Sequence, residues 1–364
     1  MAFSFGFSGD DIDDVDAHEA PQATTTAAAA PSAFPVPGKP QLPAAAHSLA
    51  DLLARLPSKV AYSSLSVLLD DGTAVQLPRR ELWDVRVQLM AEEDGDAEAA
   101  EGLGKHDVKT GVYEGGFKSW ESSVDLVKVL AADPSVTGPR TSPLSVMELG
   151  CGTALPSLAL FQWAMAIDAP DRGPTSFVVA DYNPTVLQLV TLPNFVLAWA
   201  LHHRHSPLLQ EAFTLDGELE LTPDVLQAFQ AYLASSNISL SFISGAWSPE
   251  FVQLLYAAQP ARTASSLALV LGAETIYSPF ALQAFTEVVF DVLNRERAAP
   301  ESSAAALVAA KRLYFGVGGS LDDFVDKAQS KGAVISKLRE ETEGVRRGVV
   351  RCVLGTSEGA APAN

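Results

Sequence analysis

Short apolar runs alternate with longer amphipathic stretches from about Val108 to the end of the chain. The apolar runs predict buried strands at Leu144–Leu149, Ser176–Ala180, Ser239–Ser244, Leu267–Leu271 and Ala305–Ala310. Helical spacing of apolar residues predicts helices at Trp120–Ala132, Leu155–Ala166, Pro184–His202, Leu221–Ser235, Pro279–Asn294 and Leu321–Ser330. Val334–Leu338 and Val345–Leu354 predict a C-terminal antiparallel hairpin. This alternation is typical of a doubly wound, mainly parallel α/β sheet.

The chain before Val108 has a different pattern. Residues 1–46 are acidic and rich in proline, so we predict a disordered tail that opens with the aromatic run Phe3–Phe7. Residues 47–107 predict an accessory segment, with a helix at Ser48–Leu56, a hairpin about Asp71-Gly72 and a helix at Pro78–Met90. The main domain is expected to span residues 108–356, followed by a flexible end at 357–364.

Composition limits the kinds of partner. A hydrophobic content of 48% supports a sizeable core, and a net charge of −19 argues against nucleic acid as the main partner. The charge favours a basic partner such as a ribosomal or nucleic-acid-binding protein. An acidic surface that only confers solubility explains the charge equally well.

Cysteine and histidine usage gives no sign of a metal site. Two cysteines, Cys151 and Cys352, fit a reducing compartment and offer no metal cage. The clustered His202, His203 and His205 lie at a predicted helix end, where solvated surface is the simpler interpretation. The chain shows no secretory signal pattern and no apolar run long enough to cross a membrane, so we expect a cytoplasmic and nuclear protein.

The most informative short motif lies in Ser145–Pro156. Glu148 ends a predicted strand, Gly150 and Gly152 form a turn, and a helix begins at Leu155. A strand that ends in E-x-G-x-G and turns into a helix brings backbone close to a nucleotide-like ligand. NAD sites favour G-x-G-x-x-G, whereas a bulky leucine takes the place of the third glycine here. The acid suits the cationic methionine end of S-adenosylmethionine, directly or through water, so the loop favours that cofactor over NAD.

Polar and aromatic residues follow the other predicted strands, at the edge where open α/β sheets bind ligands. Asp181 can accept hydrogen bonds from both ribose hydroxyls of a cofactor. Trp247 either meets an adenine ring or only caps the sheet. Glu274, with Tyr277 three residues later, is the residue that we expect at the substrate. The glycine-rich segment after the fifth strand, residues 311–320, is interpreted as a wall of the substrate pocket.

Several segments together resemble the protein-histidine methyltransferase family, whose members methylate a histidine of a large-subunit ribosomal protein. The segments are Phe3–Phe7, Arg80–Met90, Gly111–Glu121, the glycine loop, Asp181–Asn183, Val190–Asn194, Ser244–Trp247, Glu274–Tyr277 and Tyr314–Gly319. The resemblance covers most of the chain outside the tail and an insert at His202–Ser235. It implies a seven-strand, Rossmann-like class I methyltransferase fold and S-adenosyl-L-methionine as cofactor. It also implies a basic ribosomal-protein substrate and a monomer without membrane or direct nucleic-acid binding.

The resemblance and the strand-end residues together predict the cofactor and substrate sites. The predicted cofactor-binding residues are Lys118, Ser119, Trp120, Glu121, Ser122, Glu148, Gly150, Gly152, Asp181, Tyr182, Asn183, Gly245, Ala246, Trp247 and Ala273. The predicted substrate pocket contains Tyr314, Phe315 and Gly318, and no metal is expected. Two small residues depart from the family pattern. Ser122 stands where we expect cysteine in close relatives, and Ala154 stands where many methyltransferases have a third glycine.

Glu274 and Tyr277 are the predicted catalytic residues. Methyl transfer from a sulfonium is an in-line displacement, in which an enzyme supplies mainly alignment and the exclusion of water. A histidine, with a pKa of ~6.5, is largely neutral and nucleophilic at physiological pH, whereas a lysine, at ~10.4, must first lose a proton. We predict that Glu274 accepts the N–H of the imidazole nitrogen that does not attack, while Tyr277 walls the ring.

Three other functions remain open from the sequence. A lysine methyltransferase of the same fold also uses an acidic-aromatic motif after the fourth strand. A non-catalytic binding protein on a methyltransferase scaffold is less consistent with the intact Asp181, Gly150 and Gly152. A nicotinamide-dependent oxidoreductase is the most distant alternative.

Overall fold

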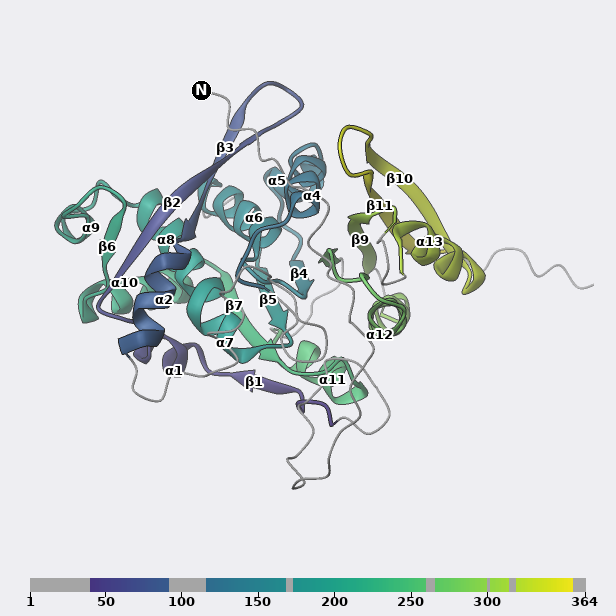
Figure 1. Ribbon diagram of the computed structural model, residues 1–364, viewed down its shortest axis with the longest axis horizontal. Helices are drawn as coiled ribbons and strands as arrows, with labels where there is room; N and C mark the ends of the chain where they lie inside the picture. Colours follow the sequence, from purple (N-terminus) through teal and green to yellow (C-terminus); the bar gives the residue numbers. More distant parts are fainter. Residues whose placement is uncertain are drawn as a thin grey trace, which may run out of the picture.

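The main sheet of the computed structural model is doubly wound, as the sequence pattern predicts. The structure describes residues 40–91, 116–167, 173–259, 266–299, 302–313 and 319–355. Within these residues the main sheet has eight strands in the order β1-β7-β5-β4-β8-β9-β11-β10 (Figure 1). Their bounds are β1 (Ala45–His47), β4 (Leu144–Leu149), β5 (Thr175–Asp181), β7 (Ile238–Ser244), β8 (Leu267–Ala273), β9 (Ser303–Lys311), β10 (Ala333–Glu341) and β11 (Arg347–Leu354).

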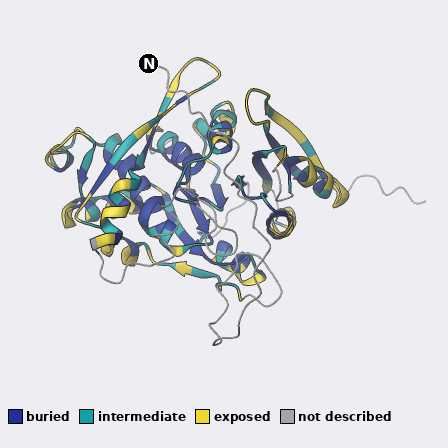
Figure 2. Cartoon of the chain, viewed as in Figure 1, coloured by how far each residue is buried: buried dark blue, intermediate teal, exposed yellow. Residues whose placement is uncertain are grey.

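The central strands separate two apolar cores. β4 pairs in parallel with β5 and β8, β5 with β7, and β8 with β9. Side chains alternate across the sheet, so Val146 lies in one core and its neighbour Met147 in the other. Figure 2 shows the central strands buried along their length. All residues of β4 and β5 are buried, as expected for parallel strands covered on both faces.

Helices cover both faces of the sheet. One face is packed by α4 (Glu121–Ala131), α6 (Leu155–Ala166), α8 (Leu192–His202) and α10 (Pro223–Ser235). The other face is packed by α11 (Pro249–Ala257), α12 (Pro279–Arg297) and α13 (Leu321–Ser330). The predicted alternation of strands and helices is therefore confirmed.

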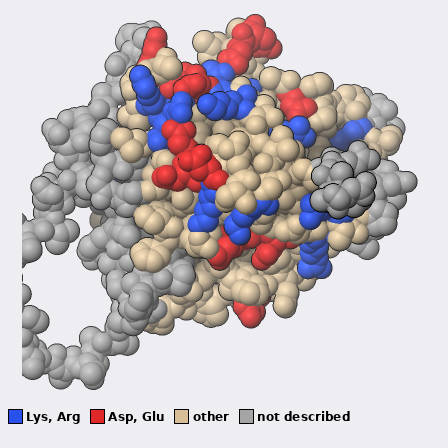
Figure 3. All heavy atoms as spheres, turned by 90° about the vertical axis from the view of Figure 1, so that its right-hand side faces the viewer, with Lys and Arg blue, Asp and Glu red and all other residues tan. Residues whose placement is uncertain are grey.

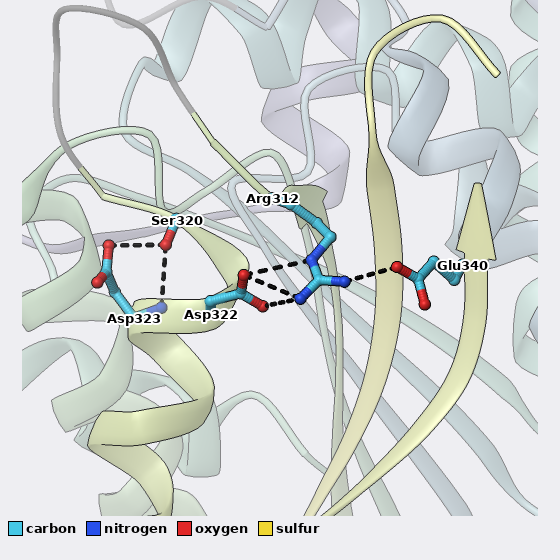
Figure 4. A network of polar contacts seen from close by, with 5 residues as sticks. All are labelled: Arg312, Ser320, Asp322, Asp323 and Glu340. Atoms are coloured by element: carbon cyan, nitrogen blue, oxygen red, sulfur yellow. Dashed lines mark hydrogen bonds and ion pairs between the residues drawn. The ribbon is translucent and has the colours of Figure 1, made fainter. Parts of the chain in front are cut away.

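The predicted C-terminal hairpin is confirmed as β10 and β11, and β11 also pairs antiparallel with β9. The Arg312 guanidinium joins this hairpin to α13, with Asp322 at 2.7 Å and Glu340 at 2.5 Å (Figure 4). The Ser320 hydroxyl caps α13 by accepting a hydrogen bond from the backbone N–H of Asp323 at 3.0 Å. On the described part of this end of the molecule, basic and acidic side chains are interspersed (Figure 3).

The accessory segment forms a second, three-stranded sheet with two helices. β2 (Lys59–Leu68) and β3 (Ala74–Arg80) form the predicted hairpin, and β2 also pairs with β6 (Glu218–Glu220) from the insert. The helices are α1 (Leu49–Ala54) and α2 (Leu82–Ala91).

The helix predicted at Pro78–Met90 starts too early. Strand β3 continues through Pro78 to Arg80, and α2 begins only at Leu82. β3 is the edge strand of its sheet, where a proline without an N–H is tolerated.

Arg80 anchors the accessory segment to the main domain. The residue is only 4% exposed, and its Nε donates to Asp84 at 2.7 Å. Its Nη1 donates to the carbonyl of Leu189 at 3.0 Å, and its backbone N–H donates to Asn194 Oδ1 at 2.7 Å. The end of β3 is therefore fixed against the helix that carries Asn194.

The first strand of the main sheet begins inside the segment that was predicted to be a disordered tail. The tail was predicted to reach residue 46, yet Ala45–His47 pair antiparallel with β7 as an eighth strand of the sheet. The sequence pattern also did not predict four short elements: α5 (Pro134–Thr137), α9 (Pro207–Ala212), β6 and α11. Apart from α11, these elements are too short for hydrophobic periodicity to register.

The helix predicted at Pro184–His202 is continuous but not uniform. It consists of α7 (Pro184–Val186), a π-helical turn, η2 (Leu187–Thr191), and α8. By length and composition alone, this helix is long and apolar enough to cross a membrane. The expectation that no apolar run has this length is therefore wrong. The most apolar window of the helix is 78% buried inside the protein, so it is a core helix here.

Candidate active site

The predicted site residues gather at the carboxyl ends of the central strands. From β4 the chain order runs through β5 and β7 on one side, and through β8 and β9 on the other. The switch point is thus at β4, and ligands of open α/β sheets bind beside such a point.

The glycine loop after β4 is built from left-handed residues. Gly150 has φ 64°, Gly152 has φ 51° and Ala154 has φ 56°. A Cβ at Gly150 would lie 2.7 Å from Thr275 Cγ2, so a side chain there would collide with the loop after β8. Ala154, which takes the place of a third glycine, keeps the left-handed conformation at a cost of about 1–2 kcal/mol.

Two side chains, one on the π-helical turn and one on α8, hold the glycine loop in place. Neither was among the predicted site residues. The Thr191 hydroxyl donates to the carbonyl of Gly152 at 2.6 Å. The Asn194 amide donates to the carbonyl of Thr153 at 3.0 Å. Both residues are fully buried, and both lie in the segment Val190–Asn194 that carries part of the family resemblance. That resemblance was the only signal in the sequence that could have pointed to them.

Glu148 lies beneath the glycine loop. Its side chain is buried, and Oε2 accepts a hydrogen bond from the backbone N–H of Ser157 at 2.9 Å, in the first turn of α6. Burial raises the pKa of the carboxyl from 4.5 to about 7. The structure therefore gives Glu148 a role at the start of α6 that the sequence did not suggest, and a contact with the methionine end of a cofactor stays a prediction.

Replacing Glu148 with glutamine is expected to flatten the dependence of stability on pH. The raised pKa means that the native state favours the protonated acid, so its stabilisation is complete below pH 4.5 and is lost as the pH rises to about 7. The loss amounts to roughly 3 kcal/mol. Urea unfolding of both proteins at pH 4.5 and pH 8 measures the change. Parallel pH profiles for the two proteins would contradict the assignment.

Asp181 joins the end of β5 to the glycine loop. Its Oδ2 accepts a hydrogen bond from the backbone N–H of Gly152 at 3.0 Å, and its Oδ1 accepts one from Asn183 at 3.0 Å. The carboxylate is buried and is held at the same sheet edge as the glycine turn. The structure therefore brings the end of β5 and the glycine turn together, and the contact of Asp181 with a ribose stays a prediction.

A backbone strap formed by Leu42 and Pro43 closes the other side of the site. The carbonyl of Leu42 accepts a hydrogen bond from the backbone N–H of Ala246 at 2.9 Å, and the N–H of Leu42 donates to the Tyr182 hydroxyl at 3.1 Å. A Cβ at Gly245 would lie 2.2 Å from the Pro43 carbonyl oxygen. Gly245 is thus required by the close approach of this strap.

The substitution Gly245→Ala is expected to displace the strap and weaken cofactor binding by at least ~10-fold, which corresponds to about 1.4 kcal/mol. Gly72→Ala is the matched control, because Gly72 also has a positive φ, of 84°, but nothing lies within 4 Å of its Cβ position. Calorimetric titration with S-adenosylmethionine measures both affinities. Equal affinities for the two variants would show that the strap does not shape the site.

Three predicted aromatic residues come together against the start of α12. Tyr182, Trp247 and Tyr277 all pack on the small side chains Ala281 and Ala284. The Trp247 ring also lies 3.9 Å from the Cβ position of Gly150. Trp247 therefore borders the glycine turn. Its ring also packs against Phe285 of the core, with ring centroids 5.7 Å apart, so its contact with an adenine ring stays a prediction.

The segment before α4 lies against the same loop. The Ser119 hydroxyl is 2.9 Å from the Thr153 hydroxyl, and the Trp120 ring lies 5.2 Å from Lys311 Nζ. Glu121 is mostly exposed and pairs with Arg347 of β11 at 2.9 Å. Its predicted cofactor contact remains a prediction.

Glu274 is held in an unusual conformation at the end of β8. Its φ of 58° is left-handed, and its backbone N–H donates to the carbonyl of Ala309 at 2.9 Å. The carboxylate accepts a hydrogen bond from the fully buried Ser122 hydroxyl. Left-handed non-glycine residues cost of order 1–3 kcal/mol and cluster at active sites.

Some predicted features fall outside the described residues. Tyr314, Phe315 and Gly318 of the predicted substrate pocket, and the aromatic run Phe3–Phe7, are among them. Within the described ranges, no group of histidine, cysteine and acidic residues could hold a metal ion.

The residues present fit S-adenosylmethionine. The left-handed turn at Gly150 and Gly152 places its backbone beside the buried Asp181 carboxylate, and the Trp247 ring lies 3.9 Å from the Cβ position of Gly150. The acid suits ribose hydroxyls, and the indole suits an adenine ring.

Comparison with known proteins gives the relatives of this chain. No known family model matches it. It is 37% identical over 294 residues to Histidine protein methyltransferase 1 of Saccharomyces cerevisiae, covering 75% of each chain. It is 35% identical over 323 residues to Histidine protein methyltransferase 1 of Schizosaccharomyces pombe, covering 86% of this chain and 87% of that one.

Solved structures show only a distant likeness. The rRNA methyltransferase aviRa from Streptomyces viridochromogenes has a TM-score of 0.35 at 14% identity, covering 65% of this chain and 86% of that one. The magnesium protoporphyrin IX methyltransferase from Synechocystis PCC 6803 has a TM-score of 0.33 at 14% identity, covering 65% and 79%.

The fold and the site define a class I methyltransferase that uses S-adenosylmethionine. At 35% and 37% identity over most of its length, the chain belongs to the histidine protein methyltransferase family. The sequence-based predictions of the fold class, of the family and of the cofactor are confirmed.

Proposed function

We propose that this enzyme transfers a methyl group from S-adenosylmethionine to a histidine imidazole of a large-subunit ribosomal protein. The observation that carries the proposal is the position of Glu274. Glu274 follows β8 beside the switch point, and its backbone has a strained left-handed conformation. Its carboxylate accepts a hydrogen bond from a buried hydroxyl.

Each residue of the site has a role in this proposal. S-adenosylmethionine, when bound, supplies the methyl group, and Gly150, Gly152, Asp181 and Trp247 would hold it. Glu274 accepts the N–H of one imidazole nitrogen, so the other nitrogen is left unprotonated and is aimed at the methyl group. The proton stays on the orienting nitrogen during the transfer and is lost afterwards from the methylated imidazolium.

Tyr277 supports the same geometry. It packs on Ala281 and Ala284 beside Trp247, three residues after Glu274. An aromatic wall in this place limits rotation of a bound imidazole and excludes water, which are the two contributions that a displacement reaction requires.

A basic acceptor protein is consistent with the charge of the chain. The net charge of −19 favours encounter with a basic protein such as a ribosomal protein. We also propose a cytoplasmic and nuclear location, because ribosomal proteins are available in both compartments before assembly. A monomeric state is part of the same proposal.

The experiment that tests the proposed substrate is methylation of fractionated ribosomal proteins with labelled S-adenosylmethionine, followed by mass-spectrometric mapping of the site. The expected result is a single labelled histidine in a large-subunit protein. Label confined to small-subunit or non-ribosomal proteins would overturn the proposed acceptor.

A further inference from the structure

We propose that Ser122 is a positioning residue that sets the orientation of the Glu274 carboxylate, rather than a contact of the cofactor. This inference rests on the proposed role of Glu274 in holding the substrate imidazole. It assigns to Ser122 a role different from the cofactor contact that the family resemblance implied.

The first observation is where the Ser122 hydroxyl points. Ser122 is the second residue of α4 and is fully buried, and its Oγ donates to Glu274 Oε1 across 152 positions of sequence. A serine hydroxyl carries one proton to donate, so this donor is committed to the carboxylate.

The second observation is the state of the helix end. Trp120, at the N-cap of α4, provides no side-chain hydrogen bond to the first turn. The N-terminus of a helix carries a partial positive charge and stabilises an anion placed beside it. The Glu274 carboxylate meets the first turn of α4 through Ser122, so the hydroxyl that donates to it comes from a helix end that attracts a nearby anion.

The third observation is that the backbone of Glu274 is fixed independently. Its N–H is bonded to the Ala309 carbonyl at 2.9 Å, and its backbone has the left-handed φ of 58°. With the backbone fixed, the remaining freedom lies in the side-chain torsions. A bond from Ser122 to one carboxylate oxygen restricts those torsions and leaves the direction of the second oxygen defined.

The consequence concerns one step of the reaction. An acid that orients an imidazole must present an oxygen to the N–H within a narrow range of angles. Loss of the Ser122 hydroxyl removes one restraint on the direction of the carboxylate, so fewer bound histidines have the reactive tautomer and direction. The defect is therefore expected in kcat and not in the affinity for S-adenosylmethionine.

A double-mutant cycle tests the inference, with the large-subunit ribosomal protein fraction as methyl acceptor. Activities are measured for the wild type, Ser122→Ala, Glu274→Gln and the double variant. Ser122→Ala is expected to lower kcat by ~10- to 100-fold, the range for a hydrogen bond to a charged group. In the Glu274→Gln background the same change is expected to have less than about a twofold effect, because the glutamine amide no longer orients the imidazole for transfer.

Two further variants separate positioning from folding. Ser122→Cys keeps a weak donor of similar size and is expected to recover part of kcat. Ser123→Ala, on the same turn of α4, is the matched control and is expected to retain full activity. Calorimetric titration with S-adenosylmethionine and thermal melting accompany each variant.

The outcomes distinguish this inference from the proposed function. Full activity of Ser122→Ala beside an inactive Glu274→Gln overturns the inference alone. Equal losses in cofactor affinity and activity for Ser122→Ala also overturn it, in favour of a cofactor contact. Full activity of Glu274→Gln overturns the proposed role of the acid itself.

Discussion

Replacing Glu274 with glutamine is expected to lower kcat by ~10²- to 10⁴-fold, while the affinity for S-adenosylmethionine stays unchanged. The range is that of a positioned acid–base group. Glutamine has nearly the same shape, so the change removes mainly the charge and one acceptor. Its amide N–H₂ would face the imidazole N–H and favour the wrong tautomer, as the loss of an orienting acid does in a catalytic triad.

The control for this prediction is Glu287→Gln, an acid exposed on α12. Single-turnover methylation with labelled S-adenosylmethionine measures the chemical step for both variants, and calorimetry measures cofactor binding. Equal rates for the wild type and Glu274→Gln would remove the acid from the mechanism. A parallel loss of cofactor affinity would place Glu274 in the cofactor site instead.

The second large effect is expected for Asp181→Ala, which should weaken S-adenosylmethionine binding by roughly 10- to 100-fold. Hydrogen bonds to charged groups contribute about 1.5–3 kcal/mol, and the ribose is expected to lose such bonds. The change also leaves the backbone N–H of Gly152 without its 3.0 Å acceptor, so the glycine turn loses support.

Asp224→Ala provides the comparison for this variant, because Asp224 is exposed in the first turn of α10. Calorimetric titration gives both affinities, and melting curves show whether either variant loses stability. An Asp181→Ala protein that is folded and binds the cofactor as tightly as Asp224→Ala would exclude the carboxylate from the cofactor site.

The sequence predicted the strand and helix at the centre of the candidate site because their signals are local. Strand, glycine turn and helix follow one another between Leu144 and Ala166, and periodicity alone places both bounds where the structure has them. Asp181 and Glu274 each end an apolar run, so their position at the sheet edge follows from the parallel topology.

The rest of the site depends on contacts between distant segments. The Leu42–Pro43 strap has the composition of a disordered tail. A backbone hydrogen bond to Ala246 holds it in place, and it can approach this closely because Gly245 has no side chain. The bond from Ser122 to Glu274 likewise joins a helix start to a strand end. Neither contact can be predicted from the local pattern of polar and apolar residues.

Glu148 shows a different limit. The sequence identified the acid and its place at the end of the strand, but not the depth at which the side chain lies. Its burial under the first turn of α6 follows from packing around the loop and raises its pKa to about 7. Residue type and spacing alone do not distinguish this position from one exposed to a ligand.

The central claim is that Glu274 directs methyl transfer to a histidine. The most direct measurement is acid hydrolysis and amino-acid analysis of a ribosomal protein fraction after incubation with the enzyme and methyl-labelled S-adenosylmethionine. The account predicts label in methylhistidine with the wild-type enzyme and a loss of that label with Glu274→Gln. Label in methyllysine, or undiminished methylhistidine with Glu274→Gln, would contradict it.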